Sequence, residues 1–555
     1  MCVVGVMWRH VLVAPSTVAV GIGGQDFHFY AWSLDVVARG LFRWGPGFRT
    51  SVLYPVEGGV PLTADGTILG LALPLAPLTR LLGSTFTLNI VMLSAPPLNG
   101  AAAFWAYRKV LGSRCGGAVL GSLLFALSPY VMGHSLGHAN LVHLWWLPLS
   151  MGLLFRSCCG EGADSTRRRQ AVAGGAVLGF AMWIGSEPVA IAVVTIVPWA
   201  LFLIVRYRRK VDVRLLLGAG AVAAVTAFPV VWGTVADTNH YQGAHQPPNV
   251  YVSDAVNAIV PTTYSLAGTV TNSASISSSW TGNDAENTGY LSVFGVGLVA
   301  WTLLSAGKGR RRAVAGLGAW ALLLSHGPSL HIAGADTGIL MAPGKLLSAA
   351  PLLKSILPAR ISFVMFFALG ALVSLAAGER KAAIRAVPPR VRPLRLIHPD
   401  RGPRILAVAT VLAVLPPLTM PSFDVTRSFG SEALSPIACG SKGGRSRAVA
   451  LPRELSGYDA LSWQRHGDFG VDLIRARFFI RTYPMQGRPL MLDGYATTAG
   501  GPVSDANVIS QLQSLGTTCV VSRPDALSPR TISRLDSLLG PPRFLGGLNY
   551  WTVER

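Results

Sequence analysis

The sequence predicts a mainly α, polytopic membrane protein with about 10–11 spanning helices and a small C-terminal α/β domain outside the membrane. Three observations predict this fold class. Hydrophobic residues make up 51% of the 555 residues and charged residues only 13%, which is about half the usual charged share. Apolar segments recur along the chain, and basic residues gather in every second loop between them. The composition excludes a disordered chain, a coiled coil and an ordinary cytosolic enzyme.

The membrane-spanning bundle is expected over residues 86–420. A spanning helix needs about 20 apolar residues, and several candidate segments are shorter, so their ends are only approximately predicted. The ten segments are 86–107, 116–133, 140–155, 171–186, 188–205, 215–233, 289–306, 313–325, 357–377 and 405–419.

The loops between these segments alternate in charge. Five Arg and Lys residues lie between positions 206 and 214, whereas the following loop, 234–288, contains no Lys or Arg. Because Lys and Arg are retained on the cytoplasmic side, the basic loops are expected there. The net charge of +21 therefore indicates membrane topology and no nucleic-acid partner. The segments expected to face outward are 1–85, 134–139, 234–288, 326–356 and 420–555.

The first outer segment, 1–85, contains two apolar stretches that do not fit as spans. Residues 67–83 carry Pro74, Pro77 and Arg80, and counting them as an eleventh span would invert every later loop. We expect an interfacial or re-entrant helix there. Residues 1–24 contain no uninterrupted apolar stretch of spanning length. We expect an N-terminus that faces outward or crosses the membrane weakly, or else a sequence start that omits a first helix.

The C-terminal segment, 421–555, is long enough for a small extracytoplasmic domain with its own core. Strands are expected at 446–451, 517–521 and 543–553, and a helix at 528–539. Two cysteines of this segment, Cys439 and Cys519, would lie where disulfides persist. The sequence leaves open whether they are bonded to each other or are two unrelated thiols.

Soluble-enzyme signatures are missing from the sequence: it has no P-loop, no GxSxG, no HExxH and no zinc-spaced CxxC pair. The remaining candidates are polar residues at the outer ends of apolar segments. His134 and His138 share a helix face, so they could bind a metal, contact substrate or form interfacial hydrogen bonds. Glu187 could bind acceptor hydroxyls or pair with a histidine. No cofactor is assigned, and a divalent metal stays open.

Asp26 is the candidate for a general base. It begins an aromatic, amphipathic stretch in the first outer segment, and Asp65 follows in the same segment. A carboxylate beside apolar surface can have its pKa raised, which suits a base. The alternative is that Asp26 caps a helix that begins at Phe27.

The order of these features resembles the GT-C superfamily of membrane glycosyltransferases, and more closely a group of actinobacterial GT-C-like integral membrane proteins. An acidic outer loop precedes an aromatic juxtamembrane helix, a second interfacial helix and many spans. The resemblance extends from about residue 8 to the C-terminus. The stretches that carry it are 53–55, 65–67, 126–142 (ALSPYVMGHSLGHANLV), 185–187, 288–291 (TGYL), 327–338 (GPSLHIAGADTG) and 357–360 (LPAR).

The resemblance implies an enzyme of the bacterial plasma membrane that transfers a hexosyl or pentosyl group, with inversion, from a polyprenyl-phosphate donor. The acceptor would be an extracytoplasmic envelope glycan or glycolipid. Asp26 would be the base, and His134, His138, Glu187 and Asp65 would line the cavity. Arg360, Lys345 and Lys354 are the cations available to a donor phosphate, although each could instead extend to the interface.

Two other classes of protein remain as alternatives. A transporter or flippase for a lipid-linked precursor would need charges along a path through the membrane, but the few charges of the predicted spans lie at their outer ends. A non-catalytic scaffold acting through its outer domain is the other alternative.

Overall fold

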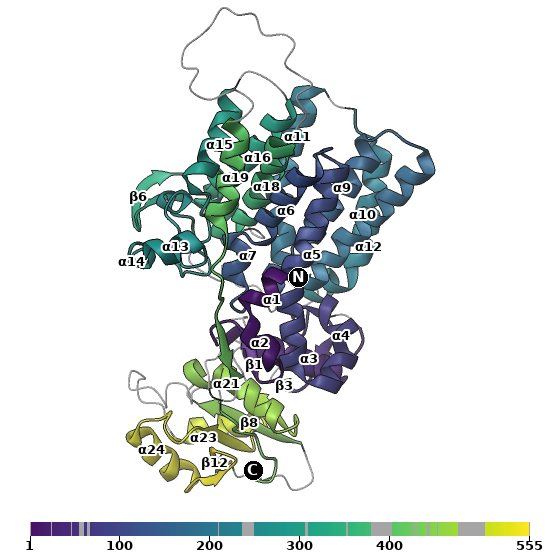
Figure 1. The fold of residues 1–555 in the computed structure, drawn as a ribbon. Helices are drawn as coiled ribbons and strands as arrows, with labels where there is room; N and C mark the ends of the chain where they lie inside the picture. Colours follow the sequence, from purple (N-terminus) through teal and green to yellow (C-terminus); the bar gives the residue numbers. More distant parts are fainter. Residues whose placement is uncertain are drawn as a thin grey trace, which may run out of the picture. The chain divides into compact units, whose positions relative to one another are not determined.

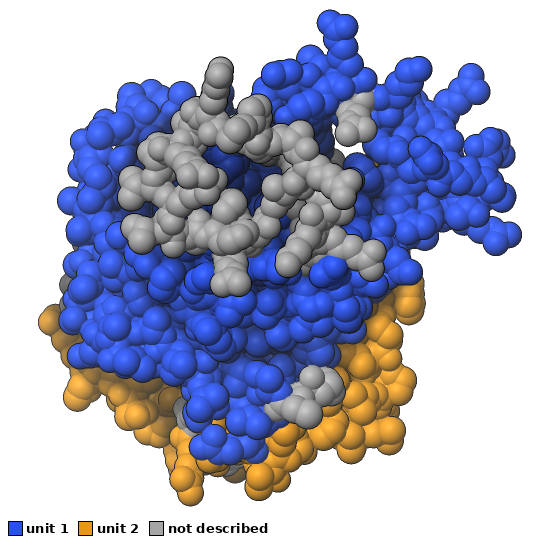
Figure 2. All heavy atoms as spheres, turned by 45° about the horizontal axis from the view of Figure 1, so that its top comes forward, with its two compact units in different colours: residues 1–9, 91–227, 244–421 blue, residues 10–90, 228–243, 422–555 orange. Residues whose placement is uncertain are grey.

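The structure is a computed structural model, shown as a ribbon in Figure 1. It describes residues 2–553 apart from residues 24, 46, 55–59, 64–66, 209, 236–248, 306–308, 351–352, 354, 379–401, 426, 428–429, 441–444, 452 and 475–504. The chain forms two compact units, coloured in Figure 2. Unit 1 comprises residues 1–9, 91–227 and 244–421, and unit 2 comprises residues 10–90, 228–243 and 422–555.

Unit 1 is a helical bundle with short outer elements. Its helices in chain order are α1 (Cys2–Met7), α5 (Ser84–Lys109, from Val91), α6 (Cys115–Ala126), α7 (Pro129–His134), α8 (Ala139–Val142), α9 (Trp146–Cys159), α10 (Asp164–Ile184), α11 (Ser186–Tyr207), α12 (Val213–Val235, to Ala227), η1 (Ala255–Ala258), α13 (Leu266–Thr271), α14 (Ala274–Ser277), α15 (Ser292–Leu304), α16 (Gly309–Ser325), α17 (Ala342–Ala349), η2 (Pro358–Ile361), α18 (Ser362–Gly378) and α19 (Gly402–Val414). Strands β5 (Ser329–Ile332) and β6 (Ala335–Leu340) form an antiparallel hairpin.

The predicted helical membrane fold is confirmed, and each of the ten predicted segments contains a helix. Among the described residues, four apolar helical stretches are long enough to cross a membrane by length and composition: Cys115–His134, Ser186–Tyr207, Val213–Gly233 and Pro358–Ala377. Segment 116–133 is divided into α6 and α7 because Ser128 caps α7 and Pro129 occupies its first turn. Segment 140–155 is likewise divided into α8 and α9.

The α6–α18 contact lies at the centre of the bundle, and small residues make it close. A Cβ atom added at Gly121 would lie 2.2 Å from the carbonyl oxygen of Gly370, so only glycine fits there. Small residues at a crossing let two helix backbones approach within van der Waals contact. Tyr107 of α5 donates a hydrogen bond to the Phe367 carbonyl at 2.8 Å and fixes α5 to α18.

Unit 2 contains a six-stranded sheet with the order β11-β12-β10-β8-β9-β3. Strands β8 (Ser446–Leu451), β9 (Val471–Ile474), β10 (Cys519–Ser522) and β3 (Leu53–Tyr54) run parallel. Strand β12 (Leu548–Thr552) pairs antiparallel with β10, and β11 (Arg543–Leu545) pairs antiparallel with β12. Three helices accompany the sheet: α21 (Arg453–His466), α23 (Asp505–Ser514) and α24 (Pro529–Leu539). A core that includes Val449, Leu512, Val520, Leu535 and Trp551 lies between sheet and helices.

The expected strands at 446–451 and 517–521 and the helix at 528–539 correspond to β8, β10 and α24. The single strand expected at 543–553 is instead the hairpin β11–β12. Gly546 and Gly547 form its turn with φ of 56° and 80°, a conformation that glycine adopts without strain.

Residues 10–85 of the first outer segment belong to the same unit as the C-terminal segment. Their elements are α2 (Arg9–Val13, from His10), β1 (Val18–Val20), α3 (Gln25–Ala38), β2 (Arg49–Thr50), β3, β4 (Val60–Pro61) and α4 (Leu69–Leu82), followed by the first turns of α5. Residues 1–85 and 421–555 were expected as separate domains, but β1 pairs with β7 (Ser422–Asp424) and β3 pairs with β9. Helix α4, expected over 67–83, contains Pro74 and Pro77 and packs on α3.

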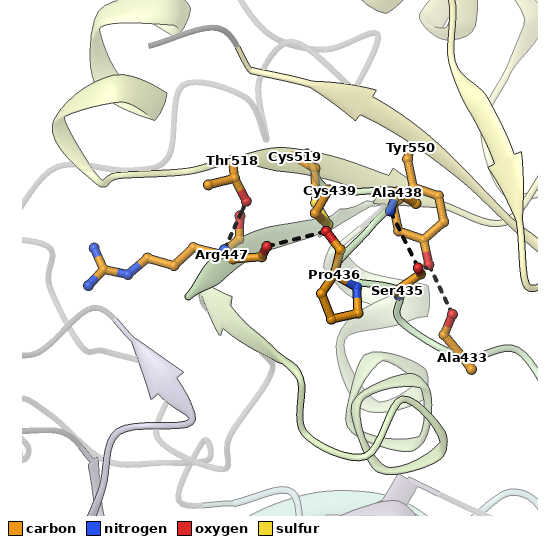
Figure 3. Close-up of a disulfide and its surroundings, with 10 residues drawn as sticks. Ala433, Ser435, Pro436, Ala438, Cys439, Arg447, Thr518, Cys519 and Tyr550 are labelled. Carbon is orange, nitrogen blue, oxygen red and sulfur yellow. Dashed lines mark hydrogen bonds between the residues drawn. A yellow bond between two sulfur atoms is a disulfide. The ribbon is translucent and has the colours of Figure 1, made fainter. Parts of the chain in front are cut away.

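A disulfide joins Cys439 to Cys519, the pair that the sequence left open (Figure 3). Their Cα atoms are 5.0 Å apart although 80 positions separate them in the sequence. The bond attaches the segment before β8 to strand β10. Beside it, the Tyr550 hydroxyl donates a hydrogen bond to the Ala433 carbonyl at 2.9 Å and accepts one from the Ser435 amide at 3.0 Å.

Candidate functional site

The candidate site of unit 1 is a charge cluster of four residues that come from four segments. Glu187 lies in the first turn of α11, Arg360 lies in η2, His134 ends α7, and Glu286 lies between α14 and α15. His134 is fully buried and Glu286 is 3% exposed, while the Arg360 and Glu187 side chains are 15% and 24% exposed. We call these four residues the charge cluster.

Arg360 lies between the two carboxylates of the cluster. Its Nε donates to both Glu286 oxygens, at 2.9 and 3.1 Å, and its Nη2 also donates to Glu286. Its Nη1 donates to Glu187, whose other oxygen accepts from the Leu357 amide at 3.4 Å. Bidentate pairing of this kind fixes the plane of a guanidinium as well as its position.

His134 completes the cluster from the end of α7. Its Nδ1 lies 2.9 Å from the Tyr130 carbonyl oxygen and its Nε2 lies 3.3 Å from Glu286 Oε2. Both ring nitrogens therefore face hydrogen-bond acceptors. The Arg360 guanidinium contacts both carboxylates and offsets their charge, which allows Glu286 to be buried.

The Glu286 carboxyl stays ionised in this setting. Burial alone would raise its pKa, but the charges of Arg360 and His134 and their hydrogen bonds hold the pKa well below its usual range.

Local sequence explains how these side chains reach each other. A Cβ atom at Gly133 would lie 2.7 Å from the Thr288 methyl group, so glycine lets the loop that carries Glu286 approach α7. Pro358 begins η2 with its fixed φ and sets Arg360 in a single tight turn. Glu187 lies at the N-terminus of α11, where the helix dipole favours a carboxylate.

The structure thus brings together three of the predicted site residues, His134, Glu187 and Arg360. The His138 ring lies edge-on to the His134 ring with centroids 5.3 Å apart, and burial lowers the pKa of His138 to about 3. Lys345 is exposed on α17. Lys354 and Asp65 lie outside the described residues. No group of three or more His, Cys, Asp or Glu side chains that could hold a metal is found in the described part of the chain.

Asp26 lies in unit 2, in the first turn of α3, and is partly buried. The helix begins at Gln25, so Asp26 is already inside it. The capping alternative places the start of this helix at Phe27, two positions later than the structure does. A carboxylate in the first turn is stabilised by the helix dipole.

Glu286 is the residue that the sequence reading missed. It lies in the long loop 234–288, which contains no Lys or Arg, so a buried carboxylate there needs a cation from another segment. Arg360, at the outer end of a span, is such a cation. This shortage of local partners is the signal that could have identified the pair.

An apolar groove of about 190 Å³ runs along the bundle within unit 1. Its lining follows α15 from Leu291 to Leu303 and α18 from Met365 to Leu372, with α16 as the third side, and every lining residue is apolar or glycine. Met365 lies five residues after Arg360 on the continuous η2–α18 stretch.

Comparisons with known proteins agree with this architecture. A family profile described as "Domain of unknown function (DUF6311)" matches residues 2–384. ArnT from Cupriavidus metallidurans, whose crystal structure contains undecaprenyl phosphate, matches with a TM-score of 0.51 at 13% identity, covering 100% of this chain and 97% of ArnT.

A second solved structure is the arabinofuranosyltransferase AftD from Mycobacteria. It matches with a TM-score of 0.53 at 14% identity, covering 100% of this chain and 40% of AftD. No curated protein sequence matches the chain significantly. These likenesses show that the chain has the fold of the GT-C membrane glycosyltransferases.

Proposed function

Because the chain belongs to the family described as a domain of unknown function, DUF6311, and has the GT-C fold, we propose that it is a membrane glycosyltransferase. It moves a hexosyl or pentosyl group from a polyprenyl-phosphate donor to an envelope glycan or glycolipid. The observation that carries the proposal is the match over nearly the full length of ArnT, a protein solved with undecaprenyl phosphate. We place the enzyme in a bacterial plasma membrane with the C-terminal domain outside.

The proposed reaction is a single inverting displacement. Asp26 takes the proton of an acceptor hydroxyl, and the oxygen attacks the anomeric carbon of the donor sugar. The bond from that carbon to the phosphate oxygen breaks, and the polyprenyl phosphate leaves with the bonding electrons. A phosphate leaving group needs positive charge to stabilise it and no protein acid.

The apolar groove supports a lipid-linked donor, because a polyprenyl chain would find only hydrocarbon surface along α15, α16 and α18. We propose Arg360 as the phosphate ligand. In the structure its charge is already shared by two carboxylates, so the phosphate must displace one of them. Glu187 is the more exposed, at 24% against 3% for Glu286, and it is the partner that the phosphate replaces.

The remaining predicted residues have proposed places around this step. Lys345, exposed on α17, and Lys354 are further cations for the phosphate. His138, Asp65 and the displaced Glu187 line the acceptor side. A divalent metal is not required by this arrangement, since Arg360 supplies the positive charge that the leaving group needs.

The test compares cells that carry the wild type, a deletion, Asp26→Asn or the control Asp525→Asn, which changes an exposed carboxylate of unit 2. Lipid extracts are analysed for polyprenyl-phosphate sugars, and the envelope for glycan linkages. We expect the deletion and Asp26→Asn to lose one linkage and accumulate donor, whereas Asp525→Asn matches wild type. If the deletion has this effect and an abundant Asp26→Asn protein does not, transport or scaffolding of the precursor is the better account.

A further inference from the structure

We infer that the C-terminal domain holds helix α3, which carries the proposed base, in its working position through three side-chain contacts from α21. The inference rests on the proposed function and deepens it by assigning positioning residues to the same step. All of the contacts lie within unit 2. We call them the α3 clamp, which consists of Ser462 with His28, Gln464 with Trp32, and Arg465 with Asp35.

The central contact of the clamp joins Trp32 to Gln464. The Trp32 indole N–H donates to Gln464 Oε1 at 2.8 Å, and both side chains are fully buried. The Gln464 amide nitrogen donates to the carbonyl of Val52 at 2.7 Å and to that of Val471 at 2.9 Å. One buried amide therefore links α3, the residue before β3 and the first residue of β9, with every one of its hydrogen-bonding groups in use.

The second contact is an ion pair at the C-terminal end of α3. Arg465 Nε donates to Asp35 Oδ2 at 2.7 Å, and the Ser84 hydroxyl donates to the same oxygen at 2.8 Å. Arg465 Nη2 reaches Ser84 as well. The Asp35 and Arg465 side chains are only 16% and 11% exposed, so solvent weakens this pair less than a surface pair.

The third contact lies two residues after Asp26. The His28 ring is hydrogen-bonded through Nδ1 to the Ser462 hydroxyl, and its Nε2 lies 3.5 Å from Asp459. A serine, a histidine and an aspartate in contact could indicate a hydrolase. His28 and Ser462 are only 2% and 3% exposed, so no substrate reaches them, and the contact fixes the helix instead.

The spacing of the contacts makes them a clamp for the whole helix. Positions 28, 32 and 35 follow the i, i+4, i+7 pattern and lie on one face of α3. Strand pairing also connects the first outer segment to the C-terminal domain, because β1 pairs with β7 and β3 pairs with β9. Helix α3 therefore depends for its orientation on α21 as well as on α4, and the direction of its first turn, with Asp26, depends on the α21 contacts.

The experiment uses the full-length protein in proteoliposomes with a polyprenyl-phosphate sugar donor. The variants are Trp32→Phe, which removes the indole N–H together with part of the ring, Arg465→Met and the conservative Arg465→Lys. The matched control is Arg530→Met, which changes an exposed arginine of α24 in the same domain. Amide hydrogen exchange of residues 25–38 is measured together with kcat and the donor KM.

We expect faster exchange in α3 and unchanged exchange in the bundle helices α6 and α18 for Trp32→Phe and Arg465→Met. The same variants should lose about 10- to 100-fold in kcat at unchanged donor KM, since a small displacement of a catalytic group is enough for such a loss. Arg465→Lys should recover part of both effects, and Arg530→Met should match wild type.

Unchanged exchange in α3 would overturn the clamp, and so would faster exchange with an unchanged kcat. The proposed function fails in a different way: Asp26→Asn then transfers sugar as fast as wild type, or neither protein transfers any. In that case the kcat measurements no longer support a positioning role for the α3 clamp. The hydrogen-exchange measurements still show separately whether α21 holds α3.

Discussion

At the residue scale, the two carboxylates of the charge cluster have different surroundings. Glu286 contacts both Arg360 and His134 and is almost completely buried, whereas Glu187 contacts Arg360 and a backbone amide and is 24% exposed. Removing one partner of a buried ion pair leaves the other charge uncompensated. The two residues should therefore respond differently to the same Glu→Gln change.

We expect Glu286→Gln to lower the free energy of unfolding by about 3–5 kcal/mol, because the Arg360 guanidinium loses its most deeply buried counter-charge. Glu187→Gln should leave the fold intact and lower the donor KM, since the phosphate no longer competes with a carboxylate for Arg360. Thermal unfolding in detergent and donor titration measure the two effects. An increased donor KM in Glu187→Gln would contradict the displacement step.

At the element scale, the crossing of α6 and α18 depends on the missing side chain of Gly121. We expect Gly121→Ala to lower stability by about 1–3 kcal/mol, because its Cβ overlaps the Gly370 carbonyl. Gly116→Ala is the matched control on α6, since no atom lies within 4 Å of its added Cβ, and a helical alanine is intrinsically favoured over glycine. The unfolding midpoints of the two variants are compared. Equal midpoints would show that α6 and α18 can move apart to admit the added Cβ atom without a loss of stability.

At the scale of the whole molecule, the Cys439–Cys519 disulfide allows two tests, one of the stability of unit 2 and one of the cellular compartment in which unit 2 lies. We expect Cys439→Ser to lower the stability of unit 2 by about 4 kcal/mol, because the bond closes a loop of 80 positions in the unfolded chain. Cys115→Ser, at an exposed free cysteine of unit 1, is the control. Alkylation after denaturation of protein taken from intact cells reads the bond directly. Two alkylated thiols at 439 and 519 would contradict an oxidising, extracytoplasmic location.

The sequence by itself determined the features that depend on local pattern. Long apolar stretches predict helices wherever they occur, so all ten segments contain one, and short β-branched and apolar stretches predict β8 and β10. The outer ends of these segments also identified His134, Glu187 and Arg360 as candidates, because a charge beside hydrocarbon needs a reason to be there. The GT-C fold was implied by the resemblance to that superfamily, and the solved structures of similar fold agree with it.

Only the tertiary structure decided which distant residues meet. Glu286 lies 74 positions from Arg360, and Trp32 lies 432 positions from Gln464, so no local period relates either pair. The first outer segment joins the C-terminal sheet because its short strand β3 pairs with β9 at the edge of the sheet. A contact of this kind depends on the path of the whole chain. The sequence therefore yields the elements and the candidate residues, and the folded chain decides their partners.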